Sequence, residues 1–169
     1  PVARARSRSC GIMAPSGWKS ECVHVLSGEV IEVNRDEILR HFVCTPSRVA
    51  VVGASPKTDR PVFRVMNYLS GAGFTLFPVN PAYTGTEILG RPCAASLTSL
   101  GEAVDVVALF VSAEKQSGIA ADLKNLPGRP VVCFQPGAEN RTLAESLEKG
   151  GYPVLEDCLM AAHMNKCGA

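Results

Sequence analysis

A short basic turn at residues 53–61 carries the clearest chemical signal in this sequence. The turn follows an apolar run typical of a strand and precedes a spacing typical of a helix. Lys57, Arg60 and Arg64 gather around the expected start of that helix, where free N–H groups and the helix dipole favour an anion. Ser55 adds a hydroxyl group that can donate a hydrogen bond. These residue types therefore predict a phosphate-binding site.

A nicotinamide or flavin dinucleotide is the first candidate ligand, but the turn lacks the expected fingerprint. That fingerprint is G-x-G-x-x-G, followed about 20 residues later by an acid that binds the ribose. Gly53 stands alone, because Ser55 and Thr58 occupy the other two glycine positions. The second expected strand ends at Asn80, which is not an acid. A nicotinamide-dependent oxidoreductase domain therefore remains only as the alternative hypothesis.

Coenzyme A (CoA) is the second candidate ligand, and its phosphates match the positive charge of the turn. CoA carries a pyrophosphate and a ribose 3′-phosphate, and cationic side chains bind such groups through strong charge-assisted hydrogen bonds. Pro61 suits the first turn of a helix, because the N–H group that proline lacks would have no partner there. We therefore expect CoA or an acyl-CoA as the ligand.

Strands and helices must alternate to position this turn, and they do so from residue 48 onward. Short apolar runs predict five strands, at 48–52, 74–79, 105–111, 131–134 and 153–155. Helical spacings lie between them, and the clearest places Val62, Val65, Met66 and Leu69 on one face. This alternation predicts an α/β fold, a Rossmann-like doubly wound five-stranded parallel sheet with helices on both faces.

The expected strand order is 3-2-1-4-5, and it determines where a ligand binds. In this order the crevice opens between the first and fourth strands, at their carboxyl ends. The loops at 53–61 and 135–137 meet there, and the loop that contains Asn80 and Pro81 lies beside them. We therefore expect the basic turn at the mouth of the crevice.

Length and charge predict one globular domain preceded by a short arm. The chain has 169 residues, of which 46% are hydrophobic and 20% charged, which suits one domain with a core of its own. The formal net charge is +1, but residues 1–20 carry +4 and no acid, so the remainder carries −3. We expect residues 1–33 to form a flexible arm or a targeting segment and residues 34–169 to form the domain.

The body of the chain lacks the features of nucleic-acid-binding and membrane proteins. Its negative charge differs from the basic surface that binds nucleic acid, and no apolar run approaches the roughly 18 residues that cross a bilayer. We expect no nucleic-acid or membrane partner and a cytoplasmic location. The Arg- and Ser-rich start also resembles a transit peptide, so a mitochondrial location is the alternative.

Seven cysteines occur in the chain, and their spacing gives no metal or redox motif. No two are spaced as C-x-x-C, so we expect reduced thiols and no metal site. Cys133 is predicted to lie in the core, whereas Cys93 follows a proline in a loop and is the best candidate for an exposed thiol. Cys158 and His163 are five residues apart, and we expect them to pack a helix. We nominate no catalytic residue.

The segment VVGASPKTDRPVFRVMNYLSGAGFTLFPVNP, residues 51–81, resembles the stand-alone CoA-binding domain family. These small proteins are related to the CoA-binding domain of the succinyl-CoA synthetase alpha subunit. The shared pattern is a strand, G-x-S-x-x-x-x-R-P, a helix and P-V-N-P. Weaker matches follow in EILGRPCAASL and VDVVALFVSAEK, and the resemblance covers about residues 38–163.

The resemblance implies that CoA binds in the crevice and suggests which residues contact it. The implied contacts are Gly53, Ala54, Ser55 and Lys57 at the pyrophosphate, Val79, Asn80 and Pro81 beside the adenosine, Phe110, Val111 and Ser112 as a wall, and Gln135 and Gly137 near the pantetheine. Two departures stand out. The family usually has an arginine where this chain has Val111-Ser112, and its C-terminal D-x-C-x-x-x-x-H pattern begins here with Glu156.

Three functions remain to be compared. The first is a CoA-binding module without catalysis, the second is the nicotinamide-dependent oxidoreductase domain, and the third is an accessory part of an NDP-forming acyl-CoA ligase. The missing glycine fingerprint disfavours the second. The chain is too short for the further ligase domains, and it contains no G-x-x-x-x-G-K-[ST] nucleotide loop. The sequence therefore favours the binding module.

Overall fold

The computed structural model describes residues 35–167, which contain a five-stranded parallel sheet. Its strands are short runs of β-branched and other apolar residues, and most of their side chains are buried. In chain order they are β1 (Arg48–Val52), β2 (Thr75–Val79), β5 (Val106–Leu109), β6 (Val131–Phe134) and β7 (Val154–Glu156). A separate antiparallel pair comprises β3 (Glu87–Ile88) and β4 (Arg91–Pro92).

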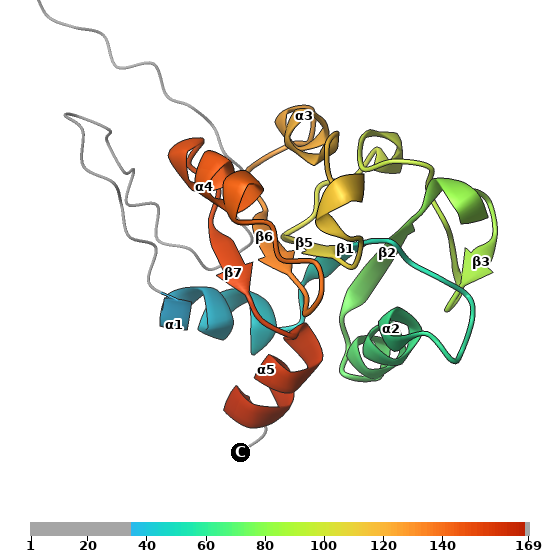
Figure 1. Cartoon of the computed structure of the whole chain (residues 1–169). Helices are drawn as coiled ribbons and strands as arrows, with labels where there is room; N and C mark the ends of the chain where they lie inside the picture. Colours follow the sequence, from blue (N-terminus) through green and yellow to red (C-terminus); the bar gives the residue numbers. More distant parts are fainter. Residues whose placement is uncertain (1–34, 168–169) are drawn as a thin grey trace, which may run out of the picture. The chain divides into compact units, whose positions relative to one another are not determined.

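Helices cover both faces of the sheet, as predicted (Figure 1). They are α1 (Arg35–Ile38) with the π-helical turn η1 (Leu39–Val43), α2 (Pro61–Gly71), α3 (Ile119–Lys124), α4 (Arg141–Lys149) and α5 (Leu159–Lys166). Short 3₁₀ turns occur at η2 (Pro81–Tyr83), η3 (Thr98–Leu100) and η4 (Ala113–Lys115). The bounds of α2 agree with the helical spacing from Val62 to Leu69.

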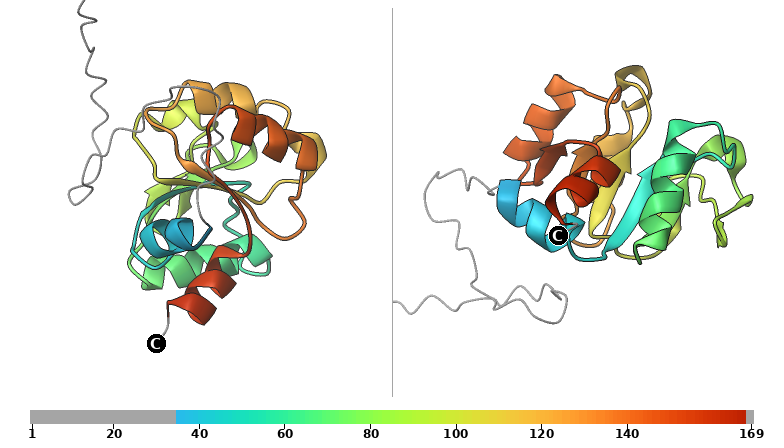
Figure 2. Two further views of the ribbon diagram at one scale, coloured as in Figure 1. Left: turned by 90° about the vertical axis from the view of Figure 1, so that its left-hand side faces the viewer. Right: turned by 90° about the horizontal axis from the view of Figure 1, so that it is seen from below.

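Two apolar clusters, one on each face, hold these layers together. Val49 and Val51 of β1 face the cluster formed with η1, α2 and α5, whereas Ala50 and Val52 face the cluster formed with α3 and α4. Successive residues of a strand point to opposite faces, so one strand supplies both clusters. The left panel of Figure 2 shows the sheet between these two layers of helices.

The observed strand order corrects one prediction. The five strands run β2-β1-β5-β6-β7, which is 2-1-3-4-5 in the order of the predicted strands rather than 3-2-1-4-5. The segment beyond β2 pairs with it only through a bridge between Val79 and Ala94, too short to be seen as an apolar run. The third predicted strand, β5, therefore pairs directly with β1. The point at which the strand order reverses, where a crevice forms, lies between β1 and β5.

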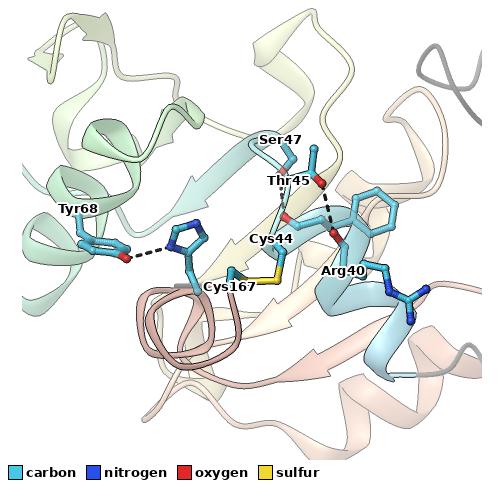
Figure 3. Close-up of a disulfide and its surroundings, with 8 residues drawn as sticks. Arg40, Cys44, Thr45, Ser47, Tyr68 and Cys167 are labelled. Atoms are coloured by element: carbon cyan, nitrogen blue, oxygen red, sulfur yellow. Dashed lines mark hydrogen bonds between the residues drawn. A yellow bond between two sulfur atoms is a disulfide. The ribbon is translucent and has the colours of Figure 1, made fainter. Parts of the chain in front are cut away.

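A disulfide bond between Cys44 and Cys167 corrects the prediction of reduced thiols (Figure 3). Cys44 ends η1 and Cys167 ends α5, so the bond joins the two extremes of the described chain. Cys93 is only 3% exposed, so the prediction of an exposed thiol there is wrong. Cys133 is buried in β6, which confirms its predicted place in the core.

The predicted arm at 1–33 lies outside the described residues. Among residues 35–167, no helix is long and apolar enough to cross a membrane. Over the same range, no group of histidine, cysteine or acidic side chains is placed to bind a metal ion.

Candidate functional site

Hydrogen bonds join the loops that follow β1 and β2. The N–H groups of Gly53 and Ala54 donate to the carbonyl oxygen of Val79, at 2.8 and 3.3 Å. The side-chain amide of Asn80 donates to the oxygen of Ala54 at 2.8 Å, and its Oδ1 accepts from the N–H of Ala82 at 3.0 Å. Asn80 therefore fixes the start of the basic turn against the end of β2.

The turn after β1 also approaches the end of β5 closely. Gly53 has φ of +91°, and a Cβ atom there would lie 2.8 Å from Cγ1 of Val111 and 3.3 Å from the carbonyl carbon of Phe110. Only glycine combines this backbone conformation with this lack of volume. Gly53, the one glycine of the dinucleotide fingerprint that this chain has, therefore allows the loops after β1, β2 and β5 to meet.

The basic turn leads into α2 with its cationic side chains exposed. Lys57, Arg60 and Arg64 are exposed, and no ion pair involving them is found within residues 35–167. Arg60 precedes the helix without capping it through its side chain, and Pro61 is its first residue. The Oγ atom of Ser55 accepts from the N–H of Lys57 at 3.2 Å, so its own O–H remains able to donate. The helix start thus offers N–H groups and positive charge to an anion.

A cleft of about 420 Å³ opens beside these loops, at the carboxyl ends of β1 and β2. Five of the predicted contact residues line it, namely Gly53, Val79, Asn80, Pro81 and Val111. Its other walls come from residues 95–97 and from the segment 115–122 at the start of α3. The structure therefore brings the predicted adenosine residues together around one cavity with Gly53 and one of the three predicted wall residues, Val111. Lys57, Arg60 and Arg64 lie outside its lining.

Other predicted contact residues do not line this cleft. Ala54 is fully buried, Phe110 is half-buried against the α2 side of the core, and Ser112 is exposed. Gly137 donates its N–H to both carboxylate oxygens of Glu139, at 3.0 and 2.9 Å. These backbone hydrogen bonds hold the pKa of Glu139 below its ordinary value.

Gln135, predicted near the pantetheine, is buried and has structural partners. Its Nε2 donates to the carbonyl oxygen of Asp157 at 3.0 Å and to Sγ of Cys133 at 3.1 Å. Its Oε1 accepts from the N–H of Leu159 at 3.2 Å. Gln135 thus ties β6 to the start of α5, and its side chain lies away from the cleft lining.

Two charged residues of the cleft wall were missed by the sequence reasoning. Lys115 and Asp122 both line the cleft, from η4 and α3. The short polar segment that contains Lys115 resembles an ordinary solvated loop in sequence. Only the packing of α3 against the sheet, a long-range effect, turns this segment toward the crevice.

A larger hollow of about 680 Å³ lies elsewhere, between α4 and β7. Its charged lining comprises four glutamates and two arginines, namely Glu139, Glu145, Glu148, Glu156, Arg35 and Arg141. This net negative charge disfavours a phosphate ligand. The smaller cleft beside the basic turn is therefore the better candidate site for CoA, despite its size.

Cys158 and His163 have the packing role that was predicted for them. Nδ1 of His163 lies 2.9 Å from the hydroxyl oxygen of Tyr68, and its ring contacts Phe74 edge to face with the centroids 5.5 Å apart. Within residues 35–167, no hydrogen bond joins Cys158 to His163. The histidine thus joins α5 to α2 through Tyr68, which Figure 3 shows on α2.

Comparisons with known proteins agree with the fold and identify the family. Residues 47–164 match the model of a CoA-binding domain family. The uncharacterized protein YneT of Bacillus subtilis is 33% identical over 126 residues, which are 74% of this chain and 91% of YneT. Since the family model covers most of this chain, the protein belongs to the CoA-binding domain family.

This chain is also similar to part of an enzyme and to a protein of solved structure. The ADP-forming acetate–CoA ligase I of Archaeoglobus fulgidus is 39% identical over 69 residues, which are 41% of this chain and only 10% of the ligase. A solved structure of protein ID.343 from Thermus thermophilus has a TM-score of 0.71 and 31% identity, and the match covers 78% of this chain and 98% of that one. The Rossmann-like α/β fold is thus shared with a solved relative.

Proposed function

We propose that this protein binds CoA or an acyl-CoA at the cleft beside the basic turn and catalyses no reaction of its own. Membership of the CoA-binding domain family supports CoA as the ligand class. The observation that carries the proposed site is the group of Lys57, Arg60 and Arg64 beside the start of α2, next to the cleft. In this proposal the CoA phosphates lie at residues 53–64.

The family resemblance suggests where the remaining parts of CoA lie. Val79, Asn80 and Pro81 border the adenosine part, and Val111 forms the facing wall of the cleft. The pantetheine part then extends toward the loop at 135–137. The nicotinamide alternative is not favoured, because the side chain at the tip of β2 is an amide that already bonds Ala54 and Ala82 rather than a free acid.

Titration calorimetry with CoA and with NAD tests the ligand class. We expect measurable CoA binding and much weaker NAD binding, and equal or better NAD binding would contradict the proposal. The variants Lys57→Ala and Arg60→Ala should each weaken CoA binding by about tenfold, because a charge-assisted hydrogen bond contributes about 1.5 kcal/mol or more. The exposed Lys149→Ala in α4 is the matched control. Both losses should shrink as salt rises.

Incubation with acetyl-CoA, or with CoA, a fatty acid and ATP, tests the absence of catalysis. General acid–base catalysis needs a group within hydrogen-bond reach of the reacting atom, and His163 instead bonds Tyr68. We expect free thiol to change only at the background rate. Turnover above background that is lost in His163→Ala would contradict the non-catalytic role.

A further inference from the structure

Two charged side chains of the cleft, Lys115 and Asp122, form no ion pair with any other residue in the described part of the chain. Both line the cleft, Lys115 is exposed and Asp122 is half-buried. Among the described residues that line this cleft, they are also the only charged ones. Their charges are therefore available to whatever occupies it.

The backbone beside Lys115 is held firmly, although the lysine itself is exposed. Its neighbour Gln116 is 2% exposed, and Nε2 of Gln116 donates to the carbonyl oxygens of Val111 at 2.8 Å and of Ala138 at 2.7 Å. The N–H of Lys115 itself donates to the oxygen of Ser112 at 2.9 Å. These bonds tie the turn to the loops after β5 and β6, so the base of Lys115 has a fixed place at the cleft wall.

Lys115 approaches the carboxyl ends of β1 and β5 from the face of the sheet opposite to the basic turn. The helix α2, which follows Lys57 and Arg60, packs on one face of the sheet, and α3, which follows Lys115, packs on the other. Figure 1 shows these two helices on either side of β1 and β5. A ligand at the carboxyl ends of β1 and β5 therefore lies between cationic groups from both faces.

We propose that Lys115 binds a phosphate of the ligand from the α3 side, so that the phosphates are held from both faces of the sheet. This inference rests on the proposed binding of CoA at the cleft. Asp122, on the same wall, opposes the lysine, because its carboxylate repels a bound phosphate. Lys115 and Asp122 thus act in opposite directions on the affinity of the cleft for a negatively charged ligand. The two variants should consequently change CoA affinity in opposite directions.

Calorimetric titration of CoA into Lys115→Met and Lys124→Met compares the same loss of charge at two exposed positions of this region. Methionine keeps much of the apolar stem of lysine, and Lys124 is exposed in α3 but absent from the cleft lining. We expect Lys115→Met to weaken CoA binding by about fivefold at low salt, as for an exposed charge pair, and Lys124→Met to leave it nearly unchanged. Thermal unfolding should be similar for both variants.

Asp122→Asn and Glu114→Gln form the second matched pair, since each removes one negative charge from this segment. Glu114 is exposed in η4 and does not line the cleft. Asp122→Asn should strengthen CoA binding severalfold and Glu114→Gln should not, because Coulomb repulsion falls with distance and with screening. Neither Lys115→Met nor Asp122→Asn should change the affinity for pantetheine, which carries no phosphate.

Titration with 3′-dephospho-CoA identifies the phosphate that Lys115 contacts. An undiminished effect of Lys115→Met assigns the contact to the pyrophosphate, and a vanished effect assigns it to the 3′-phosphate. Equal CoA affinity in Lys115→Met and Lys124→Met would overturn this inference alone, as would weaker binding in Asp122→Asn. No CoA binding by the unchanged protein would overturn the proposed function as well.

Discussion

The side-chain amide of Asn80 donates a hydrogen bond of 2.8 Å to the carbonyl oxygen of Ala54, across the gap between the loops after β2 and β1. Asn80 thus takes the place that an acid holds in a dinucleotide-binding site, but it serves the backbone of the basic turn. The same residue also lines the cleft. One amide therefore both holds the basic turn and forms part of the cleft wall.

Replacement of Asn80 by alanine should weaken CoA binding by about tenfold and lower the free energy of unfolding by about 1 kcal/mol, because a hydrogen bond between the loops is lost. Asn125→Ala is the control, since Asn125 makes a similar bond, of 3.1 Å, to the oxygen of Ala121 in α3. Calorimetry and urea unfolding measure both effects. An Asn80→Ala variant that binds CoA as tightly as Asn125→Ala would show that the loops need no such bridge.

Gly53→Ala should destabilise the protein more than alanine at another glycine of positive φ. At Gly53 the new Cβ would meet Cγ1 of Val111 at 2.8 Å, whereas at Gly101, with φ of +66°, it would meet nothing within 4 Å. We expect Gly101→Ala to cost about 1 kcal/mol from the backbone alone and Gly53→Ala about 2–4 kcal/mol in urea unfolding. Adding Val111→Ala to Gly53→Ala should recover part of the loss. Equal costs at the two glycines would argue against the close approach.

Reduction of the disulfide between Cys44 and Cys167 should lower stability by about 2–5 kcal/mol, because the bond closes a long loop in the unfolded chain. The sequence separation is 123 residues, and both cysteines lie outside the matched family region at 47–164. Urea unfolding with and without a thiol reductant measures the loss. The double variant Cys44→Ser with Cys167→Ser is the control and should not respond to reductant. Alkylation under denaturing conditions should find two more thiols after reduction.

Much of this architecture could be predicted because its signals are local. The apolar runs gave the five strands, and the spacing from Val62 to Leu69 gave α2. Gly53 and Pro61 likewise marked the turn that ends β1 and the residue that starts α2. The fold class followed from these elements, because alternating strands and helices allow few arrangements.

The features that escaped prediction depend on contacts between distant segments. The strand order was wrong because a single bridge at Ala94 leaves no strand pattern in the sequence. Cys93 was expected to be exposed, but its thiol lies 3.6 Å from the carbonyl oxygen of Asn80 under the loop after β2. The disulfide partner of Cys44 is far away in the sequence, and no spacing rule identifies it. Lys115 was missed for the same reason, since tertiary packing places it at the cleft.

Burial of Cys133 should make the stability of the protein fall at alkaline pH. Burial raises the pKa of this thiol from its ordinary value of 9.0 to about 12, although the hydrogen bond that Gln135 donates to it acts in the opposite direction. Above pH 9 the unfolded chain loses this proton while the folded chain keeps it, so the free energy of unfolding decreases as pH rises toward 12.

Urea unfolding at pH 8 and pH 10 measures this decrease, and Cys133→Ala isolates it from the other groups that titrate. The drop in the free energy of unfolding between these pH values should be about 1.4 kcal/mol larger in the unchanged protein than in Cys133→Ala, because one proton differs between the folded and unfolded states. The variant will be less stable at both pH values from the lost volume, so the readout is the difference between the two drops. Equal drops would mean that Cys133 ionises in the folded protein as readily as in the unfolded chain.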